Sequence, residues 1–216
     1  MLEVIELRQY TLHPGRRETL INLFEKEFLE PQEAAGIRVL GQFRDLDDPD
    51  RFVWLRGFPD MAARPAALGT FYGGPVWAEH REAANATMID SDDVLLLRPV
   101  PGAPSIPEDG GRTFGAGSSI TATVYQLRDE PSAECLGDVT AAGAGAVALL
   151  QTEPAPNNFP GLPVREGEHV LVRIDRDGSL GASGRGGSAA WPGGEPFLVG
   201  PPRVLRLEPT DRSLLR

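Results

Sequence analysis

A proline- and glycine-rich stretch near residues 99–118 divides this chain of 216 residues into two halves of similar length. Such a stretch has few side chains able to build a core and is typical of a linker. We therefore predict one module over residues 1–100, a linker over 101–117 and a second, diverged module over 118–216. Each half has about the length of a small domain.

The first half has a pattern typical of a strand-helix-strand-strand-helix-strand unit. Residues 2–12 alternate between two faces, as in a half-buried strand. Leu20, Phe24 and Phe28 recur every four residues within a helix predicted from Pro14 to about Ala35, with Gly36 as its stop. The other predicted elements are strands over 37–44, 51–58 and 93–98 and helices over 60–71 and 75–86. This order is that of a ferredoxin-like βαββαβ module.

The second half follows the same order less clearly. Strands are predicted over 119–128, 146–153, 169–175 and 204–207, and a helix over 132–143. The glycine-rich segment 178–194 takes the place of the second helix, which is therefore short or missing. An open sheet with helices on one face leaves its other face bare, so the two halves are expected to cover each other. The predicted fold class is α+β, with tandem ferredoxin-like modules packed sheet to sheet as a barrel that encloses a cavity.

Charge and composition exclude several classes of protein. Acidic residues outnumber basic ones by 31 to 21, which argues against a nucleic-acid binder. No apolar run is long enough for a membrane span, and the N-terminus has no signal-peptide pattern. Cys135 is the single cysteine, so no intrachain disulfide can form. We therefore expect a cytoplasmic protein without nucleic-acid or membrane partners.

Several short runs in the first half resemble the NIPSNAP family. They are ELRQY at 6–10, PG at 14–15, GQF at 41–43, FVWLRGF at 52–58 and YGGPVW at 72–77, the last leading to His80 and Arg81. In the second half, NFP at 158–160 and LPVR at 162–165 look like the second module of bacterial two-module members. The resemblance implies the dimeric α+β barrel fold, which is shared with small cofactor-free monooxygenases, EthD-like proteins and some haem enzymes. It implies no particular reaction, and it makes a homodimer a possible assembly.

Strand alternation groups the first set of candidate site residues. One face of the first and third strands is purely apolar, and we expect it to pack on the helices. The mixed face is then expected to point into the space between the sheets, and it carries Arg8, Tyr10, Trp54 and Arg56. These arginines could be paired internally, for instance Arg8 with Glu6. Alternatively, Arg56 or Arg8 could receive an anionic or enolate oxygen of a substrate.

A second candidate cluster lies on the helix predicted over 75–86. Spacings of three and four place Trp77, His80 and Arg81 on one face, and Tyr72 precedes them at the helix break. His80 could act as a general base or could be a structural hydrogen-bond donor.

No metal or cofactor is predicted. The three histidines and one cysteine form no ligand-spaced cluster, and the acidic turn at 45–50 lacks the glycine of an EF-hand loop. Haem would need an axial ligand, for which His80 and His169 are the candidates. Cys135 is expected to be a core or surface thiol.

These observations favour a NIPSNAP-like protein of undefined activity that binds a small organic molecule between its two sheets. A more specific alternative is a cofactor-independent monooxygenase-like enzyme acting on an aromatic or polyketide-like substrate. Its catalytic residues would be Arg56, stabilising an enolate, and His80, taking the proton. The substrate contacts would come from Arg8, Tyr10, Trp54, Tyr72, Trp77 and Arg81. The other alternative is a non-catalytic protein-interaction module with a filled barrel.

Overall fold

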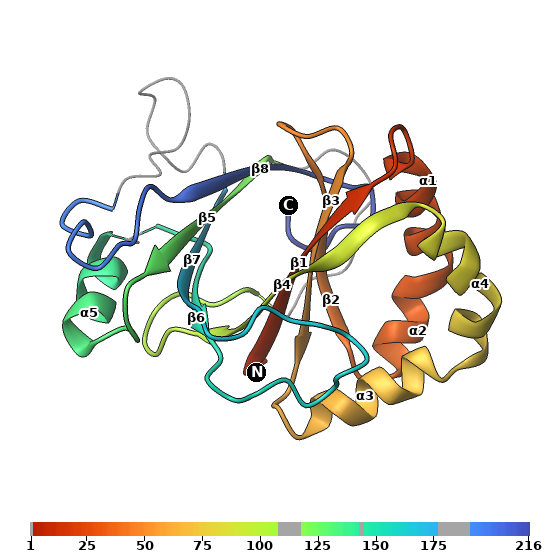
Figure 1. The fold of residues 1–216 in the computed structure, drawn as a ribbon, viewed down its shortest axis with the longest axis horizontal. Coiled ribbons are helices and arrows are strands. Elements are labelled where there is room, and N and C mark those ends of the chain that lie inside the picture. Colours follow the sequence, from red (N-terminus) through yellow and green to blue (C-terminus); the bar gives the residue numbers. More distant parts are fainter. Residues whose placement is uncertain (1, 108–117, 143–144, 177–190) are drawn as a thin grey trace.

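Eight strands form one closed barrel in the computed structural model, which describes residues 2–107, 118–142, 145–176 and 191–216 (Figure 1). The first four are β1 (Val4–Leu12), β2 (Arg38–Asp45), β3 (Arg51–Phe58) and β4 (Met88–Pro99). The second four are β5 (Ile120–Leu127), β6 (Ala148–Thr152), β7 (His169–Arg176) and β8 (Arg203–Pro209). We call the two sets, with their helices, the first and the second module.

The two modules share one strand order. Around the barrel the first reads β4-β1-β3-β2 and the second β8-β5-β7-β6, so each places its first strand between its fourth and its third. Two antiparallel seams join them, one between β2 and β8 and one between β4 and β6. Every edge strand of one module is thereby paired with the other, and the predicted fold class is confirmed.

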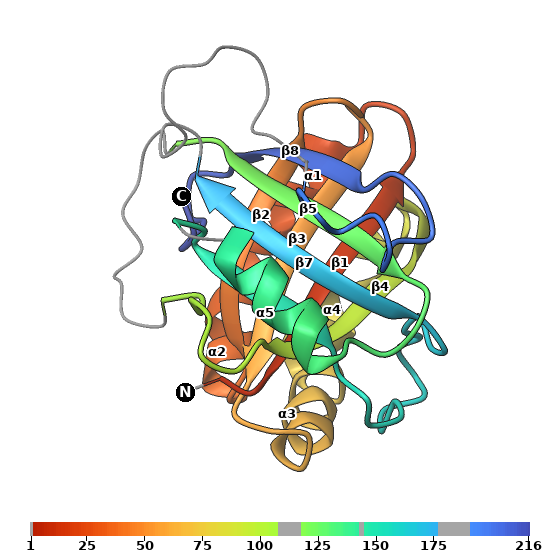
Figure 2. The same cartoon turned by 90° about the vertical axis from the view of Figure 1, so that its left-hand side faces the viewer.

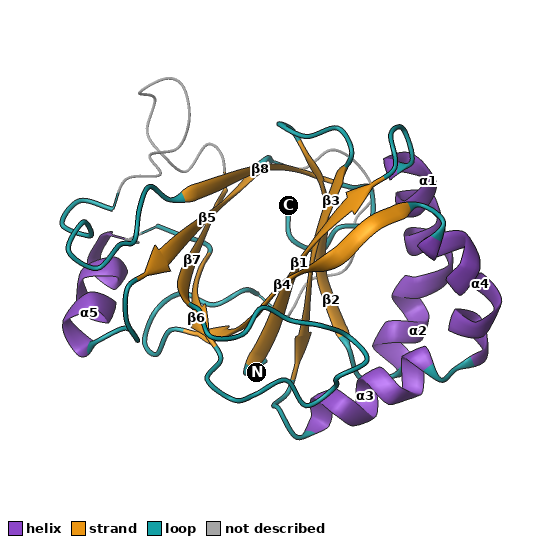
Figure 3. Ribbon diagram, in the orientation of Figure 1, coloured by secondary structure: helices purple, strands orange, loops and turns teal. Residues whose placement is uncertain are grey.

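Helices cover the outside of the barrel on opposite sides (Figures 2 and 3). The first module carries α1 (Arg17–Leu23), a π-helical turn η1 (Phe24–Phe28), α2 (Leu29–Ala34), α3 (Ala63–Tyr72) and α4 (Pro75–Asn85). The second module carries α5 (Ala133–Ala142). Most of segment 178–194, where the sequence predicts a short or missing helix, lies outside the described residues.

The helix predicted from Pro14 to Ala35 begins later and is interrupted. It starts at Arg17, and it passes through η1 before continuing as α2. Pro31 explains the interruption, because it has no N–H and its ring crowds the carbonyl four residues earlier. Gly36 has a φ of 88°, which confirms the expected helix stop. The wide turn brings Phe24 and Phe28 to the sheet, and π-helical turns of this kind are frequent at functional sites.

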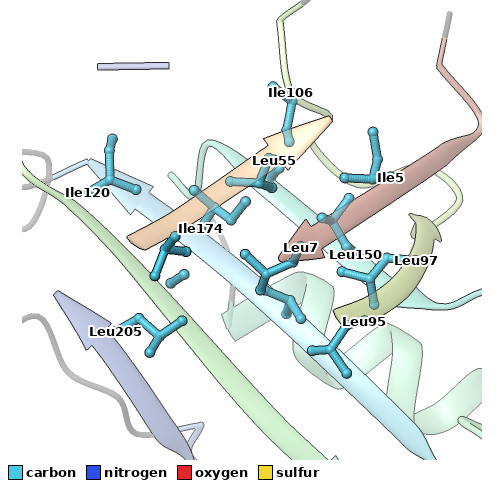
Figure 4. Close-up of a cluster of buried hydrophobic side chains, with 14 of the residues drawn as sticks. Ile5, Leu7, Leu55, Leu95, Leu97, Ile106, Ile120, Leu150, Ile174 and Leu205 are labelled. Carbon is cyan, nitrogen blue, oxygen red and sulfur yellow. The ribbon is translucent and has the colours of Figure 1, made fainter. Parts of the chain in front are cut away.

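Apolar side chains from both modules fill the inside of the barrel (Figure 4). Those labelled in the figure are Ile5, Leu7, Leu55, Leu95, Leu97, Ile106, Ile120, Leu150, Ile174 and Leu205. Eight strands enclose a space just wide enough for such side chains, and charged groups there would have neither water nor partners.

The predicted orientation of the strand faces is therefore wrong. The purely apolar face points into the barrel, and Arg8, Tyr10, Trp54 and Arg56 lie on the outer face, beneath the helices. Among the described residues, these four therefore line no cavity between the sheets. The residues do share one face, as alternation predicts, but it is the opposite one.

The packed lumen predicts the cost of shortening an inward side chain. Leu55 is 1% exposed within this core, so Leu55→Ala should lower the free energy of unfolding by about 2–5 kcal/mol, as measured by urea titration. Leu46→Ala, at a leucine that is 51% exposed, should change it by less than about 0.5 kcal/mol. Equal stability of the two variants would mean that the lumen is loosely packed.

Candidate functional site

Three arginines converge on one glutamate beneath the helices of the first module. Glu6 on β1 lies opposite Arg56 on β3, and Arg8 is two residues further along β1. Arg8 Nη1 lies 2.6 Å from Glu6 Oε2, and Arg56 Nε lies 2.8 Å from the same oxygen. Arg64 on α3 donates from Nε to Glu6 Oε1 at 2.8 Å. The four side chains, which we call the arginine cluster, are at most 2% exposed.

The arginine cluster has more positive than negative charge. Burial by itself raises the pKa of Glu6, but the charges of Arg56, Arg8 and Arg64 outweigh burial and hold this pKa far below its usual range. Glu6 is therefore ionised, and it balances only one of the three guanidinium groups. Within the described ranges, no second carboxylate makes an ion pair with these arginines.

Neutral groups complete the coordination of the remaining charges. Arg56 Nη1 donates to Tyr72 Oη at 3.2 Å, and Arg8 Nε donates to Tyr10 Oη at 3.0 Å. Arg64 Nη1 donates to the side-chain oxygens of Asn157 and Asn158 at 3.0 and 2.9 Å. The Arg56 guanidinium also lies 5.1 Å from the Trp54 ring centroid, within cation–π range. These contacts stabilise the cations without neutralising them.

A small cavity of about 40 Å³ lies next to the arginine cluster, between the sheet and the helices. Its polar lining is Tyr10, Gln32, Trp54 and Tyr72, and its apolar lining is Leu20, Phe24, Phe28, Phe71, Trp77, Ala84 and Met88. Phe24 and Phe28 come from the π-helical turn, so the irregular helix shapes this cavity. A volume of this size holds a few waters or a small ligand. We call it the aromatic cavity.

Three residues that line the aromatic cavity carry hydrogen-bond donors. The pKa of Tyr10 is raised, mainly by burial and against the opposing charge of Arg8, so its phenol keeps its proton at neutral pH. The Tyr10 and Tyr72 oxygens each accept a bond from an arginine, which leaves each O–H free to donate elsewhere. Trp54 Nε1 is buried without a partner. The arrangement suits an oxygen-bearing ligand with an aromatic or planar body.

Six of the eight predicted site residues meet at this place. Arg8 and Arg56 belong to the arginine cluster, and Tyr10, Trp54, Tyr72 and Trp77 line the aromatic cavity. The alternative in which Arg8 pairs with Glu6 is also confirmed. His80 and Arg81 do not line the cavity. His80 Nε2 lies 3.5 Å from Glu27 Oε2 at a partly exposed position, and Arg81 is exposed.

Sequence reasoning missed Arg64, Gln32 and the asparagines at 157 and 158. A signal for Arg64 existed, because Arg64, Ala67, Leu68 and Phe71 have the spacing of one helix face and all four are buried. The asparagines lie in an irregular connection between β6 and β7, and no local pattern places such a segment against α3. Figure 1 shows this connection crossing to the first module near α3.

The part of the chain that the structure describes was also compared with the requirements of metal sites, membrane spans and reactive thiols. It contains no group of three or more His, Cys, Asp or Glu side chains placed to hold a metal ion. Its helices include none that is long and apolar enough to cross a membrane. Cys135 is buried, and burial raises the pKa of its thiol to about 11, so it is protonated at neutral pH.

The arginine cluster predicts that the stability of the fold depends strongly on Glu6. Glu6→Gln removes the single counter-charge of three buried guanidinium groups, so it should destabilise the fold by about 3–5 kcal/mol in urea titrations. Glu18→Gln is the matched control, because Glu18 pairs with Arg44 at the surface and should contribute less than about 1 kcal/mol. A Glu6→Gln protein as stable as Glu18→Gln would contradict the role assigned to Glu6.

Acid should weaken the fold through the same group. The pKa of Glu6 is lower in the folded chain than its ordinary value of 4.5. The stabilisation that ionised Glu6 gives to the fold is therefore complete above the ordinary pKa. It is lost as the pH falls below that ordinary pKa toward the pKa of Glu6 in the folded chain. We expect urea midpoints of the wild type to drop from pH 5 to pH 3, and the drop to be smaller in Glu6→Gln. An equal drop in both proteins would assign the acid sensitivity to other carboxylates.

Comparisons with known structures agree with the overall fold. A candidate monooxygenase from Lactobacillus acidophilus NCFM superposes with a TM-score of 0.61 at 12% identity, covering 100% of this chain and 98% of its own. Another, from Fusobacterium nucleatum, superposes with a TM-score of 0.65 at 8% identity, covering 96% and 92%. At these identities the matches show a shared fold alone. A comparison with curated proteins found no significant match.

The family relationship rests on the first module. An uncharacterised NIPSNAP-like domain protein from Burkholderia xenovorans matches at 24% identity, with a TM-score of 0.44, over 48% of this chain and 90% of its own. The family model for NIPSNAP matches residues 5–104. Glu6, Arg8, Arg56 and Arg64 all lie within that range. The first module, which holds the whole arginine cluster, therefore belongs to the NIPSNAP family.

Proposed function

We propose that the protein binds a small organic molecule in the aromatic cavity, with a negatively charged or strongly polarised oxygen facing the arginine cluster. The observation that carries this proposal is the ratio of three buried guanidinium groups to one carboxylate. The proposed site therefore lies beneath the helices of the first module and not between the two sheets.

Charge supports an anionic ligand. Burying net charge is costly, and the cost falls when an opposite charge or a set of hydrogen bonds compensates it. Asparagine and tyrosine oxygens supply part of this compensation, and a ligand oxyanion would supply more. The Tyr10 and Tyr72 hydroxyls would donate to it, while arginine behind each hydroxyl strengthens the donor.

Size limits the ligand in the closed state. The aromatic cavity is far smaller than the range of about 300–1,000 Å³ that drug-sized ligands occupy. A molecule of a few heavy atoms fits without rearrangement. A ligand with an aromatic ring would need lining side chains to move. Trp77 on α4 lines the cavity and is partly exposed, so its side chain has room to move.

A cofactor-independent monooxygenase-like enzyme is the second candidate. Two structures described as candidate monooxygenases share the fold over nearly the whole chain, which favours it. Such an enzyme acts on an ionised substrate, and the arginine cluster would stabilise the enolate or phenolate form. His80 does not line the cavity, so this version of the proposal uses a substrate that binds already ionised.

Binding of two anions tests the proposal. Acetate fits the closed cavity, and 4-nitrophenolate reports its ionisation by absorbance. Tyr72→Phe removes one donor and keeps the ring, so it should weaken binding of either probe by roughly ten- to hundredfold.

Tyr125→Phe is the matched control, because Tyr125 is a buried tyrosine on β5 of the second module. It should leave the affinity for both probes unchanged. The proposal fails if neither probe binds to the folded wild type, or if the two variants bind equally well. In that case the cavity is a packing defect, and the interaction-module alternative gains support.

A further inference from the structure

A larger cavity lies at the seam where β4 pairs with β6. Its volume is about 460 Å³, within the range of ligand sites. The outer faces of the two strands form part of its lining through Leu96, Arg98 and Gln151, and the connection between β6 and β7 supplies much of the remainder. It shares no lining residue with the aromatic cavity. We call it the seam pocket.

Arg98 is the distinctive group in the seam pocket. It lies directly opposite Gln151 across the seam, on the same outer face as Leu96. Its side chain makes no hydrogen bond or ion pair within the described ranges, and its Nε is buried without a partner. Arg165, which also lines the pocket, is by contrast paired with Glu168 and Asp93. The Arg98 guanidinium is therefore uncommitted.

An uncommitted guanidinium in a pocket has a clear chemical complement. A buried nitrogen without a hydrogen bond costs free energy, which an incoming acceptor recovers. Carboxylates fit the planar guanidinium through two parallel hydrogen bonds. The pocket geometry therefore points to a ligand with a carboxylate group.

The remaining lining narrows the ligand class further. Apolar side chains for the ligand body come from Leu96, Pro131, Pro154, Pro156 and Val164. Four glutamates also line the pocket, at 130, 153, 166 and 168. Their charges oppose any anion, so a single ligand carboxylate has to lie at Arg98, and ligands with further negative groups, such as phosphates or dicarboxylates, are excluded.

We propose that the seam pocket binds a small monocarboxylate with an apolar body, whose carboxylate contacts Arg98. This site goes beyond the function proposed above, because it uses different residues at a different place on the barrel.

The wall of the seam pocket is held in place before any ligand arrives. Asn158 Nδ2 donates to the Met61 carbonyl at 2.6 Å, and the Arg165 N–H donates to the Val94 carbonyl at 2.9 Å. The Glu153 N–H bonds the Leu96 carbonyl at 2.9 Å. These bonds fix the connection to the first module at separate points, and such preorganisation lowers the entropic cost of binding.

Calorimetric titration with hexanoate tests the seam pocket, with hexanol and adipate as neutral and dianionic comparisons. Hexanoate should bind the wild type more tightly than either. Arg98→Gln should weaken hexanoate binding at least tenfold, and Arg98→Lys should retain part of it. Arg206→Ala is the matched control, since Arg206 pairs with Asp47 at the surface away from the pocket, and its affinity should be unchanged.

Two further variants keep the test decisive. Ala155→Trp should block the pocket while leaving Arg98 in place, so it should abolish hexanoate binding if the site is assigned correctly. Arg98→Gln should weaken hexanoate binding by the same factor in the wild type and in a Tyr72→Phe background, which separates this site from the aromatic cavity. The proposal is overturned if folded Arg98→Gln binds hexanoate as the wild type does, or if hexanol or adipate binds as tightly as hexanoate.

Discussion

Closure of the barrel by two seams within one chain is the constraint on which the rest of the structure depends. Because β2 pairs with β8 and β4 with β6, the inside of the sheet is sealed from water. Only apolar side chains can fill that space without cost. Charged residues in the middle of the strands must then lie on the outer face. In the first module this is where Glu6, Arg8 and Arg56 lie, and the helices cover them.

The sequence predicts much of the fold because its signals are local. Alternation located the strands, and fourfold spacing located the long helix, although the break near Pro31 went unpredicted. Alternation also groups Arg8 with Tyr10, and Trp54 with Arg56, correctly. It cannot say which face of a sheet is enclosed, since that depends on how many strands close the barrel. The strand faces were assigned the wrong way round because the local pattern carries no information about closure of the whole sheet.

The candidate site shows the same division between local and distant information. Residues on β1, β3 and the start of α4 could be grouped from the sequence, because strand pairing and helix spacing relate them. Asn157 and Asn158 contact Arg64 across 93 and 94 positions of the chain, respectively. These contacts come from a loop whose sequence has no hydrophobic periodicity, so they could not be predicted from a sequence pattern. The second module thus supports the first through an irregular segment.

The two modules differ on their outer faces even though their strand orders agree. At the outer face of β7, Arg173 pairs with Asp175 at 2.9 Å, so this pair is electrically balanced, unlike the arginine cluster. A barrel assembled from two identical subunits would be obliged by symmetry to carry every group twice. Joining both halves in one polypeptide removes that obligation. In the part of the chain that the structure describes, the barrel therefore carries one arginine cluster, and the outer face of the second module carries a balanced ion pair instead.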